Sequence, residues 1–301
     1  MGTNEFFKIF RGLFTTKTIQ NPKKHPSDDN EKHWEDELLS PNLAENISLI
    51  KRIFKDCSDV VYREFNVGME QKISGVLIWM DGLADKTTLN SNIMKSLIDE
   101  TRFISPNGNH INSRSFSLIR DSLLSVADIK EQDKLNDIVQ SVLTGESMLL
   151  IDGVAMSLIV STKSWESRDV SEPVTEGVVR GPRQGFTENV RTGTSLLRRI
   201  IKTPQLKMEP FKVGTLTQTD LVVAYIEGLA SEKVVEEVRR RINRINIDAV
   251  IESGYIEELI EDQPFSLFPQ IEHTERPDKA AAQLLEGRVV ILTDGTPFAL
   301  I

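Results

Sequence analysis

The sequence contains a single cysteine, Cys57, among its 301 residues. One thiol excludes an intramolecular disulfide and by itself indicates no particular redox compartment. No apolar run approaches the roughly 18–20 residues that span a bilayer as a helix. The N-terminus also lacks the long apolar stretch and small-residue cleavage site of a signal peptide. We therefore expect neither a disulfide framework nor a transmembrane helix.

Motifs for metal, nucleotide or nucleophile chemistry are also missing. The four histidines, His25, His33, His110 and His273, are not spaced as metal ligands with another His, Cys or acid. No Gly-x-Ser-x-Gly nucleophile elbow occurs. The stretch GPRQGF, residues 181–186, precedes an expected helix, but its glycine spacing is wrong for a phosphate loop and no Lys-Ser/Thr follows. We expect no metal, no cofactor and no enzymatic activity.

Positive charge is in deficit, because the formal net charge is -9. This argues against non-specific nucleic-acid binding, which depends on Lys and Arg against phosphate. The composition, 39% hydrophobic and 27% charged, is that of a soluble globular protein. The length suggests two domains, each able to bury its own core.

Residues 1–39 differ in character from the rest of the chain. In a helix, Phe6, Phe7, Phe10, Leu13 and Phe14 would share one side, with Lys8 and Arg11 on another. This pattern fits a short anchor on an anionic membrane surface. It equally fits a disordered arm whose aromatic residues dock on the protein. The following polar residues, up to about residue 39, are typical of a linker.

An internal repeat organises the remainder. IWMDGLAD, from Ile78 to Asp85, resembles AYIEGLAS, from Ala224 to Ser231, so that Asp81 and Glu227 lie 146 positions apart. Further downstream, GESMLLIDGVAMSLI (145–159) matches GRVVILTDGTPFALI (287–301) at an offset of 142. Each copy of the second element places Asp-Gly between two apolar runs, which predicts a hairpin. The order of these elements indicates a duplicated lobe.

The duplication predicts the fold. Each lobe is expected to run helix, strand, strand, helix, variable middle, helix and closing hairpin. We assign residues 40–160 to the first α/β subdomain, 161–186 to an interlobe linker and 187–301 to the second subdomain. Helices that alternate with strands and hairpins predict mixed α/β lobes with a partly parallel sheet. A cleft is expected between the lobes.

The first helix of the second lobe is expected from Glu188 to Lys202, with Thr187 as its N-cap. Basic residues flank and follow the glycine turn that precedes it, and a helix N-terminus with nearby arginines suits a carboxylate or an acidic partner. Alternatively, these arginines bridge the lobes or pair with the acidic excess. The candidate ligand- or partner-binding residues here are Arg180, Arg183, Gln184, Glu188, Asn189, Arg191 and Arg198.

Asp81 and Glu227 are the remaining candidates for ligand binding. Each acid is expected at the C-terminal end of a strand, just before a glycine turn, where ligands often bind in open α/β sheets. An acid at that position can instead cap the turn or a helix. The two acids belong to different lobes, so they form one site only if the cleft brings them together.

Two blocks carry a family resemblance: GPRQGFTENVRTGTSLLRR, from Gly181, and ERPDKAAAQLLEGRVVILTDGTPFAL, from Glu275. With them, nearly the whole chain resembles the A subunit of spore germinant receptors, the GerA family. The resemblance implies a soluble N-terminal domain on the cytoplasmic side of the spore inner membrane. It also implies a following membrane domain, partner B and C subunits, and a small nutrient such as an amino acid or sugar as signal. It transfers no functional residue.

Two functions therefore stay open. One is a sensing domain that binds a small molecule or partner in the interlobe cleft and transmits the signal by lobe closure. The other is a scaffold that assembles or clusters receptor subunits and binds no small ligand. Polar, roomy cleft walls would favour the first, and a packed apolar interface the second.

Overall fold

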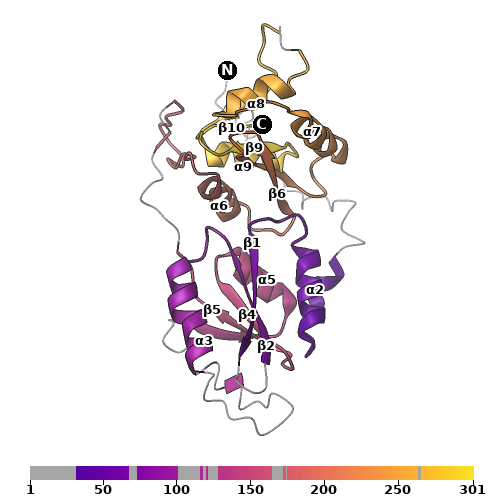
Figure 1. Ribbon diagram of the computed structural model, residues 1–301, viewed down its shortest axis with the longest axis vertical. Coiled ribbons are helices and arrows are strands. Elements are labelled where there is room, and N and C mark those ends of the chain that lie inside the picture. Colours follow the sequence, from indigo (N-terminus) through magenta and orange to yellow (C-terminus); the bar gives the residue numbers. More distant parts are fainter. Residues whose placement is uncertain are drawn as a thin grey trace, which may run out of the picture. The chain divides into compact units, whose positions relative to one another are not determined.

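The computed structural model describes residues 32–67, 73–100, 116–117, 120, 128–164, 172–173, 175–263 and 266–301. The expected amphipathic segment from Phe6 to Phe14 lies outside these ranges. Within them, no helix is both long and apolar enough to cross a membrane. Residues Trp34–Ile301 form one compact unit, which contains both expected lobes (Figure 1).

The first lobe is a five-stranded sheet with helices on both faces. Its strand order is β1-β2-β4-β5-β3. In chain order its elements are η2 (Lys32–Asp36), α2 (Leu43–Ile53), β1 (Val60–Val67), β2 (Ile73–Met80), η3 (Thr88–Met94), α3 (Lys95–Glu100), β3 (Ile129–Gln132), α5 (Leu135–Leu143), β4 (Ser147–Ile151) and β5 (Ser157–Val160).

The second lobe repeats this architecture with strand order β6-β7-β9-β10-β8. Its elements are α6 (Val190–Ile200), β6 (Leu206–Val213), β7 (Thr219–Ile226), α7 (Glu232–Arg244), α8 (Ser253–Ile260), β8 (His273–Thr274), α9 (Pro277–Leu285), β9 (Val290–Thr293) and β10 (Ala299–Leu300). The mixed α/β fold of two similar lobes, predicted from the sequence, is confirmed.

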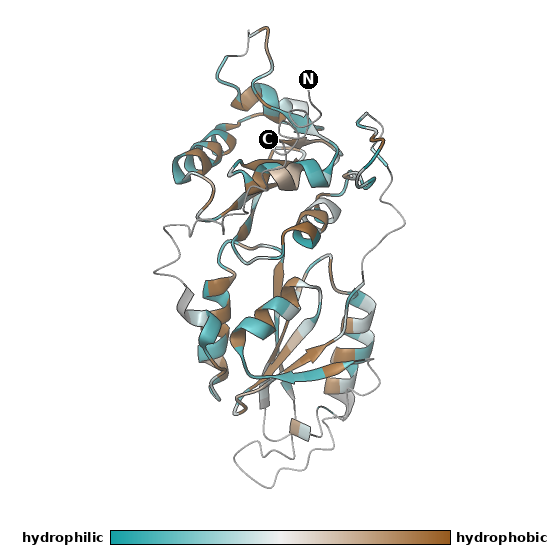
Figure 2. Cartoon of the chain, turned by 180° about the vertical axis from the view of Figure 1, so that it is seen from behind, coloured by the Kyte–Doolittle hydropathy of each residue, from teal (hydrophilic) through white to brown (hydrophobic). Residues whose placement is uncertain are grey.

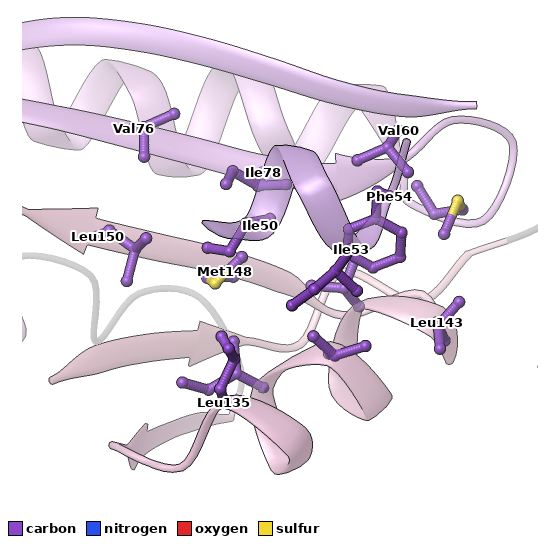
Figure 3. Packing of buried hydrophobic residues seen from close by; sticks show 14 of the residues in the cluster. Ile50, Ile53, Phe54, Val60, Val76, Ile78, Leu135, Leu143, Met148 and Leu150 are labelled. Carbon is purple, nitrogen blue, oxygen red and sulfur yellow. The ribbon is translucent and has the colours of Figure 1, made fainter. Parts of the chain in front are cut away.

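Strand alternation builds two apolar layers in each lobe. On β2, Ile78 faces the core that α2 and α5 cover, whereas its neighbour Leu77 faces the core under η3 and α3. Successive side chains of a strand point to opposite faces, so continuous apolar strands require cover on both sides. Figure 3 shows the first of these cores, where Ile50 and Phe54 pack near Met148. The second lobe divides in the same way, with α6 and α9 on one face and α7 and α8 on the other.

The strand registers carry the duplication residue by residue. Val60 pairs with Met80 in the first lobe, and their equivalents at an offset of 146, Leu206 and Ile226, pair in the second. Gly75 of β2 pairs with Ile151 of β4. Their equivalents, Leu221 at the offset of 146 and Thr293 at the offset of 142, pair between β7 and β9. Register decides which side chains reach which core. The two sheets therefore bury equivalent positions.

The Asp-Gly turns anchor the first helix of each lobe. The carboxylate of Asp152 accepts the N–H of Leu43 at 3.1 Å, and that of Asp294 accepts the N–H of Val190 at 3.0 Å. These N–H groups open α2 and α6, where the helix leaves donors unsatisfied. The flanking strands pair as the predicted hairpins. Their loops, however, bend away to reach the helix instead of forming two-residue turns.

Three expectations about local structure were wrong. The sheets are not partly parallel, since every ladder between described strands is antiparallel. From β2 to β4 the described chain passes η3, α3, β3 and α5, and it returns in the opposite direction. The short strands β3 and β8 were missed. The N-cap of α6 is Asn189, not Thr187, and the helix ends at Ile200.

The two lobes join through backbone hydrogen bonds at their sheet edges. Ser58 donates its N–H to the carbonyl of Met208 at 3.1 Å, and Met208 donates to the carbonyl of Asp56 at 2.9 Å. Both β1 and β6 are edge strands. The loop before β1 thus extends the edge of the second sheet, which satisfies backbone groups that would otherwise stay unpaired.

Candidate functional site

Helix α6 lies where the two lobes meet and is buried by both of them (Figure 1). One face packs in the core of its own lobe through Leu196 and Leu197. Another face receives the turn at Gly82, where an added Cβ would lie 2.9 Å from the Cβ of Ser195. Gly82 also has a φ of 81°, which disfavours any other residue. The Gly-Leu-Ala element of the first lobe therefore closes directly on α6.

Arg198 of α6 and Asp59 of the first lobe form a buried ion pair between the lobes. The Arg198 Nε and Nη2 donate to the two Asp59 carboxylate oxygens at 2.9 and 3.0 Å. Further donations reach the carbonyls of Thr203 and Leu206. Burial alone would lower the pKa of Arg198, but the Asp59 carboxylate outweighs it and raises the pKa. The sequence left open whether the arginines bind a ligand or partner, bridge the lobes or pair with the acidic excess. Arg198 bridges the lobes.

Asp81 and Glu227 occupy equivalent positions in the two lobes. The N–H of Asp81 donates to the carbonyl of Asp59, and the N–H of Glu227 donates to that of Gln205. The carboxylates of Asp81 and Glu227 pair with different cations. Asp81 lies 3.2 Å from Lys86 and 3.9 Å from Arg191, whereas Glu227 lies 3.0 Å from the buried Lys207.

The other candidates surround the start of α6. The side-chain oxygen of Asn189 accepts the N–H groups of Arg191 and Thr192 at 2.8 and 3.3 Å, as an N-cap does. Arg180, Gln184 and Glu188 are exposed. Arg183 is exposed as well, 3.7 Å from Glu172. A binding role for these surface residues stays a prediction.

A pocket of about 700 Å³ also lies at the junction of the lobes. Its walls come from the end of α2, the loop that joins the two sheet edges, β1, β6 and α7. The lining residues are Lys51, Phe54, Lys55, Asp56, Cys57, Ser58, Tyr62, Met208, Glu209, Pro210 and Arg239. The nine residues predicted from the sequence, all of them described, are not among these. The lining comes from separate segments without a shared motif, so only the tertiary structure brings it together.

Tyr62 presents an unsatisfied polar group at this pocket. Its hydroxyl is buried and has no hydrogen-bond partner among the described residues. Burial raises the pKa of Tyr62, and the neighbouring Cys57 and Asp59 raise it further. The ammonium group of Lys51 lies over the Tyr62 ring, 5.5 Å from the ring centroid. A buried hydroxyl without a partner costs free energy.

The opposite wall holds a satisfied network. The hydroxyl of Tyr225 donates to Glu209 at 2.6 Å, and the Nε of Arg239 donates to the same carboxylate at 2.8 Å. Burial would raise the pKa of Glu209, but the hydrogen bonds from Arg239 and Tyr225 hold it below its ordinary value. Glu209 and Arg239 therefore neutralise each other.

The remaining charged residues of the pocket carry a net positive charge. With Glu209 and Arg239 paired, Lys51 and Lys55 stand against Asp56 alone. Phe54, Met208 and Pro210 contribute apolar surface. In the described part of the chain, no group of three or more His, Cys, Asp or Glu could hold a metal ion. The arrangement suits a small ligand that combines a carboxylate with an apolar part.

Comparison with protein families places these features in context. Residues 48–301 match the family model described as Bacillus/Clostridium GerA spore germination protein. Among curated proteins, the chain is 41% identical over 266 residues to an uncharacterized membrane protein, YfkQ, of Bacillus subtilis. It is 39% identical over 264 residues to spore germination protein KA of the same organism. Each alignment covers 88% of this chain and 50% or 47% of the relative, so the chain spans about half their length.

A solved structure shows the same fold. The crystal structure of the N-terminal domain of the A subunit of the Bacillus megaterium spore germinant receptor GerK3 is 36% identical in sequence. It superposes with a TM-score of 0.68, over 88% of this chain and 96% of that one. The described lobes thus correspond to nearly all of that domain.

Proposed function

Because the chain belongs to the GerA family of spore germination proteins, we propose that it is the N-terminal domain of a germinant receptor A subunit and takes part in the nutrient sensing that triggers germination. It continues into a membrane domain in the spore inner membrane, and it lies on the cytoplasmic, spore-core side. There it assembles with the B and C subunits. Its role is binding and signalling, without catalysis or nucleic acid.

The pocket at the lobe junction is the proposed ligand site, and one observation carries this proposal. The pocket is lined by both lobes, through Tyr62 on one side and Glu209 on the other, together with Ser58 and Met208 where their backbones join. A ligand bound there contacts both lobes at once. Its binding energy then depends on how the lobes are placed, so occupancy biases their arrangement. That bias is the signal passed to the rest of the receptor.

The charges of the pocket and the unsatisfied Tyr62 hydroxyl indicate the class of ligand. Lys55 or Lys51 receives a carboxylate, Tyr62 satisfies its hydroxyl on a polar ligand atom, and Phe54 with Met208 covers an apolar part. Small amino acids have these groups. A sugar would use the hydroxyl but leave the lysines without an anion.

Titration of the 301-residue chain with amino acids and sugars tests the proposal. We expect saturable binding of an amino acid at millimolar concentration, seen by calorimetry and by NMR shifts of lobe-junction residues. Tyr62→Phe and Lys55→Ala should weaken binding, whereas Arg183→Ala, an exposed arginine outside the pocket, should leave it unchanged. No saturable shift with any nutrient would contradict a small-molecule site.

The scaffold function is the alternative, and the bonds across the lobe junction support it. The buried Arg198–Asp59 pair and the backbone bonds at Met208 hold the lobes in one arrangement, as a docking platform requires. Reversing the charge of the exposed Arg183 and Arg191 discriminates the two functions. Under the scaffold function it impairs receptor assembly in spores and leaves nutrient specificity intact. Arg198 is unsuitable for this test, because its reversal would disrupt the fold.

A further inference from the structure

The loop between α8 and β8 carries two large apolar side chains with almost no cover. Leu267 is 95% exposed and Phe268 is 80% exposed. Scattered exposed leucines are ordinary, but an adjacent Leu-Phe pair on a projecting loop is not. The loop extends away from the second lobe in Figure 1, and part of its ribbon is brown, for hydrophobic residues, in Figure 2.

The described part of this loop is shaped by its own polar side chains. The backbone N–H of Gln263 donates to the Gln270 side-chain oxygen, and the Gln270 amide donates back to the Gln263 carbonyl. Between them, the Ser266 hydroxyl donates to the carbonyl of Phe268 and accepts its N–H. The polar groups thus close on one another, which leaves Leu267 and Phe268 as the groups presented outward.

The loop ends beside the last residue of the chain. Ile301 donates its N–H to the carbonyl of Glu272 at 2.7 Å and accepts the N–H of Glu272 at 3.3 Å. The solved structure that matches nearly the whole chain is the N-terminal domain of an A subunit, and the curated relatives are about twice as long as the matched part. Under the proposed function, a membrane domain follows Ile301. The apolar pair lies on the loop that leads to Glu272, the hydrogen-bond partner of Ile301.

We propose that Leu267 and Phe268 insert into the interfacial layer of the lipid bilayer and orient the second lobe on the membrane. This rests on the proposed function, through the membrane domain that follows Ile301. The contact is apolar, because the charges that flank the loop are largely paired: Asp262 with Arg241, and Glu272 with Lys279 and Arg288. Little free charge is left there to attract anionic headgroups, whereas an aromatic residue and a leucine partition into the interface without it. A protein pocket that takes the same pair is the competing occupant.

The single buried cysteine makes a direct test possible. Cys57 is 7% exposed and Leu267 is 95% exposed, so a cysteine introduced as Leu267→Cys is by far the more accessible site for an environment-sensitive fluorophore. The chain is held on phosphatidylcholine vesicles through a C-terminal histidine tag and a nickel-chelating lipid, which places Ile301 at the surface. Lipids with a nitroxide in the acyl chain then report contact with the bilayer. Leu216→Cys, at an exposed leucine in the turn before β7, is the matched control.

Insertion predicts that the label at position 267 brightens on the vesicles and is quenched by nitroxide lipid, while the label at 216 does neither. Adding Phe268→Ser should reduce the lipid quenching at 267 by about tenfold, because it removes most of the apolar area of the contact. A label at position 267 that remains as exposed to water as the label at position 216 overturns the proposal. So does a label shielded in the assembled receptor but not quenched by lipid, which would indicate a protein pocket. Nutrient titration is a separate measurement, so either proposal can fail alone.

Discussion

The guanidinium of Arg198 in the second lobe is enclosed against the carboxylate of Asp59 in the first, with side-chain exposures of 0% and 4%. Two parallel N–H···O bonds and two carbonyl contacts satisfy the pair. Such a pair gains little over an apolar contact, but breaking it leaves a buried charge without a partner. It therefore favours the arrangement of the lobes in which these two side chains meet.

Arg198→Met should lower the free energy of unfolding by about 3–5 kcal/mol, because the Asp59 carboxylate stays buried and unpaired. Adding Asp59→Leu should recover part of that loss. Urea unfolding of the single and double variants measures the difference. Arg191→Met is the control, since Arg191 is exposed, its contact with Asp81 is as long as 3.9 Å, and surface pairs contribute about 0–1 kcal/mol. A double variant no more stable than Arg198→Met would contradict the ion-pair explanation.

Gly287→Ala should destabilise the second lobe by about 1–3 kcal/mol, through its positive φ of 86° and a Cβ only 2.7 Å from the Leu229 carbonyl oxygen. Gly145→Ala should have a similar effect in the first lobe, because its Cβ would lie 2.9 Å from the equivalent Leu83 oxygen. Gly177→Ala, with nothing within 4 Å, should change stability by less than about 0.5 kcal/mol. Thermal unfolding compares the three. Equal effects at all three positions would show that the close approach is not decisive.

Tyr62→Phe should leave stability unchanged or raise it by less than about 1 kcal/mol, since the hydroxyl it removes is buried without a partner. The same variant should weaken binding of the pocket ligand. Chemical denaturation and nutrient titration, run side by side, separate the two effects. A large loss of stability would indicate that the hydroxyl already has a structural partner.

Glu209 should make stability depend on pH in the acid range. Its pKa is lowered in the folded chain from an ordinary value of 4.5, so its contribution is fully present above that value. The contribution is lost as the pH falls through the lower, folded pKa, because the unfolded chain binds the proton more readily. Glu209→Gln should therefore show a shallower loss of stability below pH 4.5. A profile that runs parallel to the wild type would contradict this.

The duplicated lobes could be predicted because the repeated elements serve local geometry. Gly82 and Gly228 both have positive φ, and Asp152 and Asp294 both hold the first helix, so the same residues recur at fixed offsets. Apolar strands and the helix period then define each core. The offset drifts by one residue at α6, where Asn189 corresponds to Asn42. The predicted cap, Thr187, lies two residues before the observed cap, so this drift accounts for one of the two.

The candidate site could be predicted only in part. Bridging of the lobes was one alternative for the arginines around α6, and Arg198 does bridge them, yet nothing in the sequence distinguishes it from the exposed Arg191, seven residues away on the same helix. Burial separates them, and burial depends on the first lobe, more than a hundred residues upstream. The pocket was missed for the same reason, since Tyr62, Glu209 and Arg239 have no common motif.

By itself, the sequence determined the repeat, the mixed α/β lobes and the family, because turn glycines, capping side chains and apolar periodicity act over a few residues. Only the tertiary structure decided strand direction, the partner of Arg198 and the position of the pocket. These depend on which lobe surfaces meet and exclude water from one another. Charge and shape complementarity between distant segments decides which surfaces meet, and no local sequence pattern predicts this complementarity.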